Sequence, residues 1–93
     1  MTLPAAFFER PITHRGLHDR SKGVIENSLS AFEAAIAGGY GIELDVQLSS
    51  DAEAMVFHDY DMARLTGERG AIQTRTADVV RGMTLTDSSD TIF

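Results

Sequence analysis

The sequence predicts an α/β fold. The prediction depends on two patterns that follow each other without a gap: a helical pattern that ends at the Gly-Gly pair 38–39, and a strand pattern from Tyr40 to Leu48. The first has apolar residues at helical spacing, and the second alternates apolar and polar residues with a period of two. A strand entered directly from a helix is typical of an α/β unit, whose strands are usually covered on both sides.

The chain before this helix is predicted to be mostly irregular. Residues 1–8 are mildly apolar but have no basic leading segment, and no signal-peptidase site follows them, so we expect a mature N-terminus. Residues 11–14 are predicted to form a short extended segment with Ile12 buried, which ends at Gly16. Residues 17–26 are polar and are predicted to form a loop.

The best-marked helix is predicted to begin near Asn27-Ser28 and to end at Gly38-Gly39. Ser30 and Glu33 are spaced as in a capping box, in which the two side chains satisfy backbone N–H groups at the start of a helix. The apolar residues that recur at helical spacing predict its buried face, and these are Leu29, Phe32 and Ile36.

The strand predicted from Tyr40 to Leu48 has one apolar and one polar face. The apolar face, which must pack against something, contains Ile42, Leu44, Val46 and Leu48, and the polar face contains Glu43, Asp45 and Gln47. Residues 54–57 form the next apolar run. The connection to it is too short for a parallel crossover, so we expect an antiparallel hairpin.

The register of this hairpin predicts where His58 lies. A turn centred on residues 51–52 pairs apolar residues across the hairpin, Leu48 with Met55 and Val46 with Phe57. The same register places His58 opposite Asp45, and because facing residues share a side of the sheet, His58 is predicted to lie on the carboxylate face. Such a turn requires a positive φ at Ala52, where glycine would be preferred.

The remainder of the chain gives weaker signals. Residues 59–74 are rich in charge and in turn-forming residues, which predicts loop or irregular structure. Residues 76–81 are predicted to form a short helix capped by Thr76 and ended by Gly82. Residues 83–93 are predicted to be a connection.

Composition excludes several functions. The 93 residues suffice for one small domain, and no stretch approaches the ~20 apolar residues needed to cross a bilayer. The net charge of −6 and the scattered basic residues argue against nucleic acid as a partner. The sequence has no cysteine, which excludes disulfides and thiolate chemistry and fits a reducing compartment, so we expect a cytoplasmic protein.

Glu43 and Asp45 are candidate ligands of a divalent cation. Two carboxylates one position apart on a strand share a face and lie about 7 Å apart along it, close enough to hold one hard cation between them. His14 and His58 on either side would supply a proton donor and a proton acceptor, and Arg15 would suit a phosphate. These residues predict a phosphoester hydrolase site, or half of one.

Each of these residues also has a structural interpretation. Glu43 and Asp45 fit an exposed strand face, and an isolated histidine is most often a surface or satisfied core residue. Arg15 fits a surface salt bridge. Glu26 fits the start of the predicted helix, where a negative charge interacts favourably with the helix dipole.

Several short motifs occur in the order and spacing of one known family. They are His14-Arg15-Gly16, Glu26-Asn27-Ser28 with Ala31-Phe32, Gly41 to Val46, Ser50-Asp51, Val56 to Asp59, and Arg64 to Gly67. With these motifs the chain closely resembles the N-terminal part of the glycerophosphodiester phosphodiesterase family over residues 12–67, with weaker similarity over residues 76–92.

The resemblance implies metal-dependent hydrolysis of glycerophosphodiesters to an alcohol and glycerol 3-phosphate. It implies His14 and His58 as general acid and base, Arg15 as a phosphate contact, Glu43 and Asp45 as ligands of Mg²⁺ or Ca²⁺, and Glu26 as a further active-site carboxylate. Which histidine is the acid, which metal binds and which headgroup is preferred stay open.

The fold implied by the resemblance is a truncated (β/α)8 TIM barrel. Such a barrel takes ~250 residues, so residues 1–93 would be an N-terminal fragment of one barrel domain, with residues 47–86 as a small insertion after the second strand. Ile25 and Ala52 stand where the family usually has proline and glycine. A further acidic ligand and a lysine that the family supplies from later strands have no counterpart here, so the remainder of the barrel would be required.

Two other functions are compatible with the same residues. One is a non-catalytic binding or interaction domain derived from the family, which suits the length of the chain but leaves open strand edges. The other is a related phospholipase D-like toxin enzyme with the same paired histidines, although nothing in the sequence suggests secretion.

Overall fold

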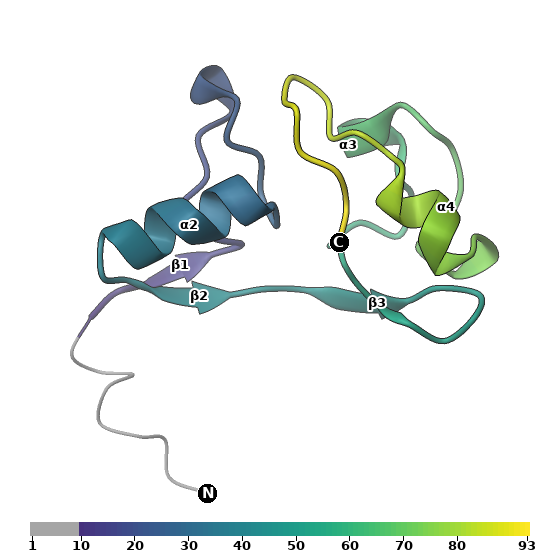
Figure 1. Cartoon of the computed structure of the whole chain (residues 1–93), viewed down its shortest axis with the longest axis horizontal. Coiled ribbons are helices and arrows are strands. Elements are labelled where there is room, and N and C mark those ends of the chain that lie inside the picture. The colour runs from purple at the N-terminus through teal and green to yellow at the C-terminus, as the bar shows by residue number, and fades with distance from the viewer. Residues whose placement is uncertain (1–9) are drawn as a thin grey trace, which may run out of the picture.

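Two groups of secondary-structure elements lie side by side along one extended ribbon (Figure 1). This arrangement comes from a computed structural model that describes residues 10–93, so the predicted mature N-terminus at residues 1–8 lies outside the described residues. The molecule is flat, with extents of 39 × 35 × 17 Å. Within residues 10–93, every helix is too short or too polar to traverse a bilayer.

The first group is a strand-helix-strand unit, which confirms the α/β prediction for this part of the chain. Strands β1 (Ile12–His14) and β2 (Gly41–Glu43) are parallel, and helix α2 (Leu29–Ala37) connects them and covers one face of the pair (Figure 1). His14 lies directly opposite Glu43 in the register. The prediction that Ile12 is buried is wrong, since the residue is 47% exposed.

Helix α2 ends before Gly38-Gly39 as predicted, but its cap and its buried face differ from the prediction. Its N-cap is Ser28, whose Oγ accepts a hydrogen bond from the Ala31 N–H at 3.1 Å, and Ser30 lies inside the helix. The buried side chains are Ala31, Phe32 and Ala35, while Leu29 and Ile36 are exposed. Phe32 is therefore buried as predicted, and the small alanines near it let the helix lie close to the chain beneath it.

Between β1 and α2 the chain forms a short 3-10 helix, η1 (Arg20–Lys22), and then runs back towards the strands. Gly16, at the start of this excursion, has φ +84° and touches α2 closely. A Cβ atom at Gly16 would lie 2.8 Å from the Ala31 Cβ, so no side chain fits there without displacing the helix.

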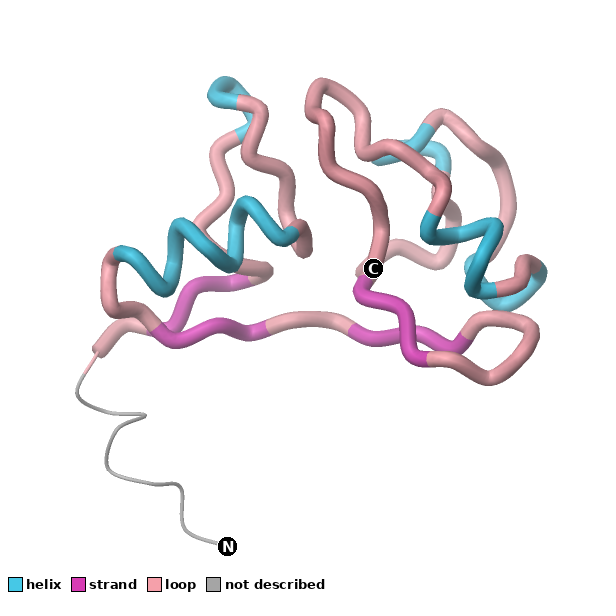
Figure 2. The backbone as a smooth tube through the Cα atoms, in the orientation of Figure 1, coloured by secondary structure: helices cyan, strands magenta, loops and turns pink. Residues whose placement is uncertain are grey.

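The strand predicted over residues 40–48 is divided in the structure. β2 ends at Glu43 and β3 (Val46–Leu48) begins three residues later, because β2 pairs with β1 whereas β3 pairs with β4 (Ala54–Val56) in a separate sheet. Figure 2 shows the irregular segment that joins them. The predicted apolar face is not packed within the described residues, where Leu44, Val46 and Leu48 are 44%, 53% and 56% exposed.

The hairpin β3–β4 is antiparallel as predicted, but its predicted register is wrong by one residue. Gln47 faces Met55, and the other facing pairs are Val46 with Val56 and Leu48 with Ala54. The connection covers residues 49–53, closed by the Ser49 N–H and the Glu53 carbonyl at 2.9 Å. Ala52 has a positive φ of 62°, as the predicted turn required, although glycine would be preferred at this position.

The second group contains the main hydrophobic core. Helix α4 (Ala77–Arg81) follows Thr76 and precedes Gly82 as predicted. The prediction of irregular structure over residues 59–74 is wrong in part, because α3 (Ala63–Thr66) and the 3-10 helix η2 (Ile72–Thr74) form there. Their apolar side chains join the core, which contains Met55, Phe57, Met62, Leu65, Ile72, Val80, Leu85 and Ile92.

The C-terminal segment holds the two groups together. Residues 83–93 contain no helix or strand, as predicted, apart from an isolated bridge between Thr84 and Thr91. The Phe93 ring meets the Phe32 ring of α2 edge to face, with centroids 5.6 Å apart. Ile25, from the loop before α2, packs into the core of the second group. The two groups therefore share apolar contacts as well as the ribbon.

Truncation of Phe57 should destabilise the protein strongly. Phe57 is 1% exposed in the core, so Phe57→Ala is expected to lower the free energy of unfolding by about 3–5 kcal/mol. Val79 on α4 is 51% exposed, and Val79→Ala should change the free energy of unfolding by less than about 0.5 kcal/mol. Urea unfolding followed by circular dichroism measures both, and equal effects would contradict the assignment of the core.

Candidate functional site

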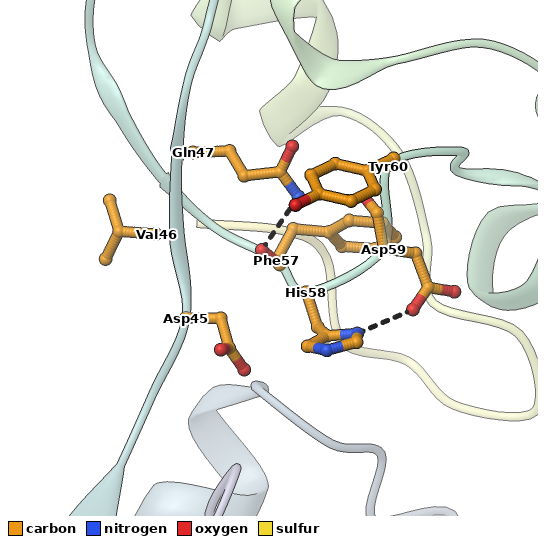
Figure 3. A pocket seen from close by; sticks show the side chains of 7 residues that line it. All are labelled: Asp45, Val46, Gln47, Phe57, His58, Asp59 and Tyr60. Atoms are coloured by element: carbon orange, nitrogen blue, oxygen red, sulfur yellow. Dashed lines mark hydrogen bonds and ion pairs between the residues drawn. The ribbon is translucent and has the colours of Figure 1, made fainter.

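The six residues predicted to form the site lie where β1 and β2 end and the hairpin begins. Five side-chain contacts form one series from Asp45 through Arg15, Glu26, Arg64 and Asp59 to His58, and a sixth contact joins His14 to Glu43. A pocket on the hairpin side is lined by Asp45, Val46, Gln47, Phe57, His58, Asp59 and Tyr60 (Figure 3). Of the six, only Asp45 and His58 line this pocket, and His14 and Glu43 form a separate contact outside it.

His14 contacts Glu43 because the parallel register places them opposite each other. The His14 Nε2 lies 3.5 Å from the Glu43 Oε2, and both side chains are largely open to solvent, 66% and 44% exposed. An imidazole in this position can exchange protons with a molecule that approaches from outside.

Arg15 leaves β1 through a left-handed turn, with φ 61°. Residues other than glycine rarely adopt this conformation, and backbone hydrogen bonds hold it here. The Arg15 N–H donates to the Glu43 carbonyl at 2.8 Å, and the Asn27 N–H, itself at a residue with φ 55°, donates to the Arg15 carbonyl at 2.8 Å. The turn thus ties Arg15 to β2 and to the start of α2.

The Arg15 guanidinium lies between two carboxylates. Its Nη1 donates to the Glu26 Oε2 at 2.8 Å, and its Nε lies 3.6 Å from the Asp45 Oδ2. The Nε is buried and makes no hydrogen bond among the described residues. A buried donor without an acceptor is costly, and here the Asp45 carboxylate at 3.6 Å offsets the charge without a hydrogen bond.

Glu26 is buried, and two arginines compensate its charge. Burial alone would raise the pKa of Glu26, but the hydrogen bonds from Arg64 and Arg15 outweigh it and lower the pKa below its ordinary value. The Arg64 Nη1 donates to the Glu26 Oε1 at 2.8 Å, so each carboxylate oxygen has one guanidinium partner. Glu26 therefore stays ionised at neutral pH and has both oxygens occupied.

Asp45 and Glu43 retain oxygens that a cation can use. The Asn27 amide donates to the Asp45 Oδ2 at 3.1 Å, the same oxygen that faces Arg15, which leaves Oδ1 without a hydrogen bond among the described residues. Among residues 10–93 no group of three or more carboxylate or imidazole side chains is arranged to hold a metal. The two carboxylates fit a site that takes a Mg²⁺-like ion through one or two carboxylates, with water or other groups completing it.

His58 reaches the pocket by a different route from the predicted one. In the observed register the Phe57 N–H donates to the Asp45 carbonyl at 3.0 Å, so Phe57 and not His58 faces Asp45. The chain leaves the hairpin after Phe57, and the Gln47 amide holds the new path by donating to the carbonyls of Phe57 and Asp59 at 3.1 and 2.7 Å. The His58 ring and the Asp45 carboxylate then lie at the same end of the pocket (Figure 3).

Asp59 orients His58. The His58 Nδ1 lies 2.9 Å from the Asp59 Oδ1, and Arg64 binds Asp59 through its Nε and Nη2 at 2.8 and 3.0 Å. The hydrogen bonds from Arg64, assisted by the one from His58, lower the pKa of Asp59 from 3.8 to about 2. A carboxylate can only accept hydrogen bonds, so the proton between the two side chains belongs to Nδ1, and Nε2 of a neutral His58 carries a lone pair.

Three residues of this network had no predicted role: Asn27, Asp59 and Arg64. Asn27 and Asp59 are next to predicted site residues in the sequence. Asparagine tolerates the left-handed conformation that Asn27 adopts, so an asparagine at this position could have indicated a tight turn at the site. Arg64 contacts Glu26 across 38 positions of sequence, and no local pattern indicates such a pair.

Fold and site together match one family of phosphodiesterases. The chain matches the glycerophosphoryl diester phosphodiesterase family over residues 14–91, which is most of its length. It belongs to this family, as the sequence motifs predicted.

Two curated relatives illustrate how much of the family's length is present. The glycerophosphodiester phosphodiesterase of Caldanaerobacter subterraneus is 41% identical over 71 residues, which are 75% of this chain and 28% of the relative. That of Bacillus altitudinis is 40% identical over 57 residues, 60% of this chain and 23% of the relative. The chain thus spans about a quarter of the length of these relatives.

Solved structures of the family contain the same arrangement. The glycerophosphodiester phosphodiesterase of Thermotoga maritima superposes with a TM-score of 0.69 at 39% identity, covering 89% of this chain and 35% of that one. A phosphodiesterase of Oleispira antarctica, solved in complex with the product sn-glycerol-3-phosphate, superposes with a TM-score of 0.77 at 27% identity. The match covers 94% of this chain and 38% of that one. The chain therefore has the fold of a part of these enzymes.

The ion pair of Asp59 should make stability depend on acid pH. Because the pKa of Asp59 is lowered on folding, the pair stabilises the protein fully above about pH 4, and this contribution disappears as the pH falls towards 2. Asp59→Asn is expected to cost about 1 kcal/mol near pH 5 and almost nothing near pH 2. Urea unfolding across this range, with the exposed Glu33→Gln as control, measures the difference. A cost that stays constant with pH would contradict an ionic origin.

Proposed function

We propose that the complete protein containing this chain hydrolyses glycerophosphodiesters to an alcohol and glycerol 3-phosphate. The observation that carries the proposal is the unbroken series of contacts from His58 through Asp59, Arg64, Glu26 and Arg15 to Asp45, with His14 beside Glu43. Family membership and the product bound to the Oleispira antarctica relative support the choice of substrate.

The two histidines are proposed as the acid-base pair. One removes the proton from the attacking oxygen, and the other protonates the leaving alkoxide. The contact between His58 Nδ1 and Asp59 leaves Nε2 as the exchanging atom of His58. The side chain of His14 is 66% exposed and that of His58 is 43% exposed, so substrate can reach both rings. Both rings therefore present a nitrogen to a molecule that enters the site.

Arg15 is proposed to bind the phosphate. Its Nη1 is held by Glu26, and its buried Nε has no hydrogen-bond acceptor among the described residues. Its Nη2 makes no hydrogen bond among the described residues, so a phosphate oxygen near Nη2 would find a donor there, and the fixed guanidinium plane would orient the phosphodiester.

Glu43 and Asp45 are proposed to hold a divalent cation, Mg²⁺ or Ca²⁺. When bound, such an ion offsets negative charge on the phosphoryl oxygens. Asn27 and Arg15 keep Asp45 in place on the side away from its free oxygen. The remaining ligands are proposed to come from water and from parts of the protein outside this chain.

The rest of the barrel is proposed to cover the exposed strands. Each of β1 and β2 pairs only with the other, and the apolar side chains of Leu44, Val46 and Leu48 are open to solvent in the part that the structure describes. Further parallel strands beside β2 would pair its free edge and bury this apolar face, as a (β/α)8 barrel requires.

The absence of cysteine suits a reducing compartment, and we propose that the protein is located in the cytoplasm.

Substitution of either histidine should abolish most activity. His14→Ala and His58→Ala are expected to slow release of glycerol 3-phosphate from glycerophosphocholine by about 10²- to 10⁴-fold, because each removes an acid-base group. His18 is exposed in the loop, and His18→Ala should stay within about twofold of the natural enzyme.

Full activity in either histidine variant would remove that residue from the mechanism. If the complete protein bound glycerol 3-phosphate but released none from any glycerophosphodiester, the proposal of an enzyme would be wrong. The family-derived binding domain would then be the better description.

Removal of divalent cations should reduce turnover to background. Chelation by EDTA is expected to stop product release, and Mg²⁺ or Ca²⁺ should restore it, because two carboxylates would otherwise face the phosphate without compensation. Glu43→Gln and Asp45→Asn should raise the cation concentration for half-maximal activity by roughly 10- to 100-fold. Glu53→Gln, in the hairpin connection, is the control and should not change it. Unaltered cation dependence in both site variants would contradict the assignment.

A further inference from the structure

We propose that Arg64 is a positioning residue for the acid-base reaction: it clamps Asp59 and thereby holds the His58 ring with its Nε2 lone pair towards the substrate. The inference rests on the proposed function, because it takes His58 as a proton-transfer group. It adds a role for a residue of α3, which belongs to the segment expected to be the family-type insertion.

The geometry of Arg64 is that of a clamp. Its Nε and Nη2 donate to the two oxygens of Asp59 at 2.8 and 3.0 Å, and its Nη1 donates to Glu26 at 2.8 Å. All three guanidinium nitrogens thus have carboxylate partners. A bidentate pair fixes the plane of a carboxylate as well as its position, which a single contact does not do.

These contacts also distinguish Arg64 from Arg15. The Arg15 Nη2 makes no hydrogen bond among the described residues, whereas each nitrogen of Arg64 already serves a carboxylate. Arg15 has a donor to offer a phosphate, and Arg64 has its donors directed at the protein. Arg64 therefore acts through other side chains and does not touch substrate.

The clamp determines which nitrogen of His58 carries the proton. Asp59 accepts two hydrogen bonds from Arg64 and uses Oδ1 for the His58 Nδ1 at 2.9 Å. Without Arg64 the Asp59 side chain, which is 20% exposed, could rotate towards water. The Nδ1–H would then lose its fixed acceptor, and the ring would sample both neutral tautomers.

The same side chain links the two halves of the site. Arg64 shares Glu26 with Arg15, so the phosphate contact and the acid-base group are held by one run of alternating charges, from Asp45 through Arg15, Glu26 and Arg64 to Asp59. Within this run each positive group lies between two negative ones. Loss of Arg64 therefore releases Asp59, and through it His58, and leaves buried Glu26 with only one of its cationic partners.

The test compares Arg64→Leu with Arg81→Leu in the complete protein. Arg81 is a matched control, since it is as exposed as Arg64, 45% against 46%, and also contacts two carboxylates, those of Glu53 and Asp78. Activity is measured as glycerol 3-phosphate release. Nitrogen NMR of ¹⁵N-histidine-labelled protein at alkaline pH reports the tautomer of His58, with His58→Gln identifying its signals.

The natural protein and Arg81→Leu should both show a single Nδ1–H tautomer of His58. Arg64→Leu should show a mixture of tautomers and a kcat lower by roughly 10- to 100-fold, with KM changed by less than about threefold. Arg64→Lys, which keeps the charge but cannot clamp both oxygens, should give an intermediate tautomer ratio and remains informative if Arg64→Leu does not fold.

An unchanged Nδ1–H tautomer in both Arg64 variants would overturn the proposal, even if their activity fell. A changed tautomer in a protein without any phosphodiesterase activity would support the clamp and contradict only the proposed function. A rise in KM with unchanged kcat and tautomer would make Arg64 a substrate contact and overturn the positioning role.

Discussion

The arrangement of the site depends on one buried charge. Glu26 is 8% exposed, and a carboxylate can remain ionised at such a position only if cations compensate it. Arg15 reaches it from the turn after β1, and Arg64 reaches it from α3 in the other group of elements. The requirement to neutralise Glu26 therefore joins the strand-helix-strand unit to the hairpin side, and the residues proposed for phosphate binding and proton transfer are fixed by the same constraint.

Elements defined by local signals were predicted well. Helix α2 and its glycine end, the short helix α4 before Gly82, and an antiparallel return after β3 all depend on neighbouring residues. The hairpin register failed because it depends on how many residues the connection contains: the prediction assumed a turn centred on residues 51–52, whereas the connection covers residues 49–53. The helical turns within residues 59–74 form because Met62, Leu65 and Ile72 find a shared core, which their spacing alone does not reveal.

Sequence patterns account for the positions of some candidate residues but not for the contacts between them. Parallel pairing of two short strands is enough to place His14 beside Glu43, and alternation along a strand marks Glu43 and Asp45. His58 was expected on the carboxylate side through a register that the structure does not have, and it arrives there because the chain bends after Phe57. The arginine-carboxylate contacts between distant segments are set by tertiary packing, so Arg64 could not be identified from sequence spacing.

The contact between Gly16 and Ala31 has an evolutionary consequence. A Cβ at position 16 would meet the Ala31 Cβ at 2.8 Å and the Ala31 backbone carbon at 3.1 Å, so a change at position 31 alone gives no room for a side chain at position 16. Relatives that carry a larger residue at position 16 should instead shift the axis of the helix outward, altering several neighbours of Phe32 together. Coordinated substitutions of this kind are expected in lineages that have a different turn at Arg15 and Gly16, and isolated substitutions at position 16 should be rare.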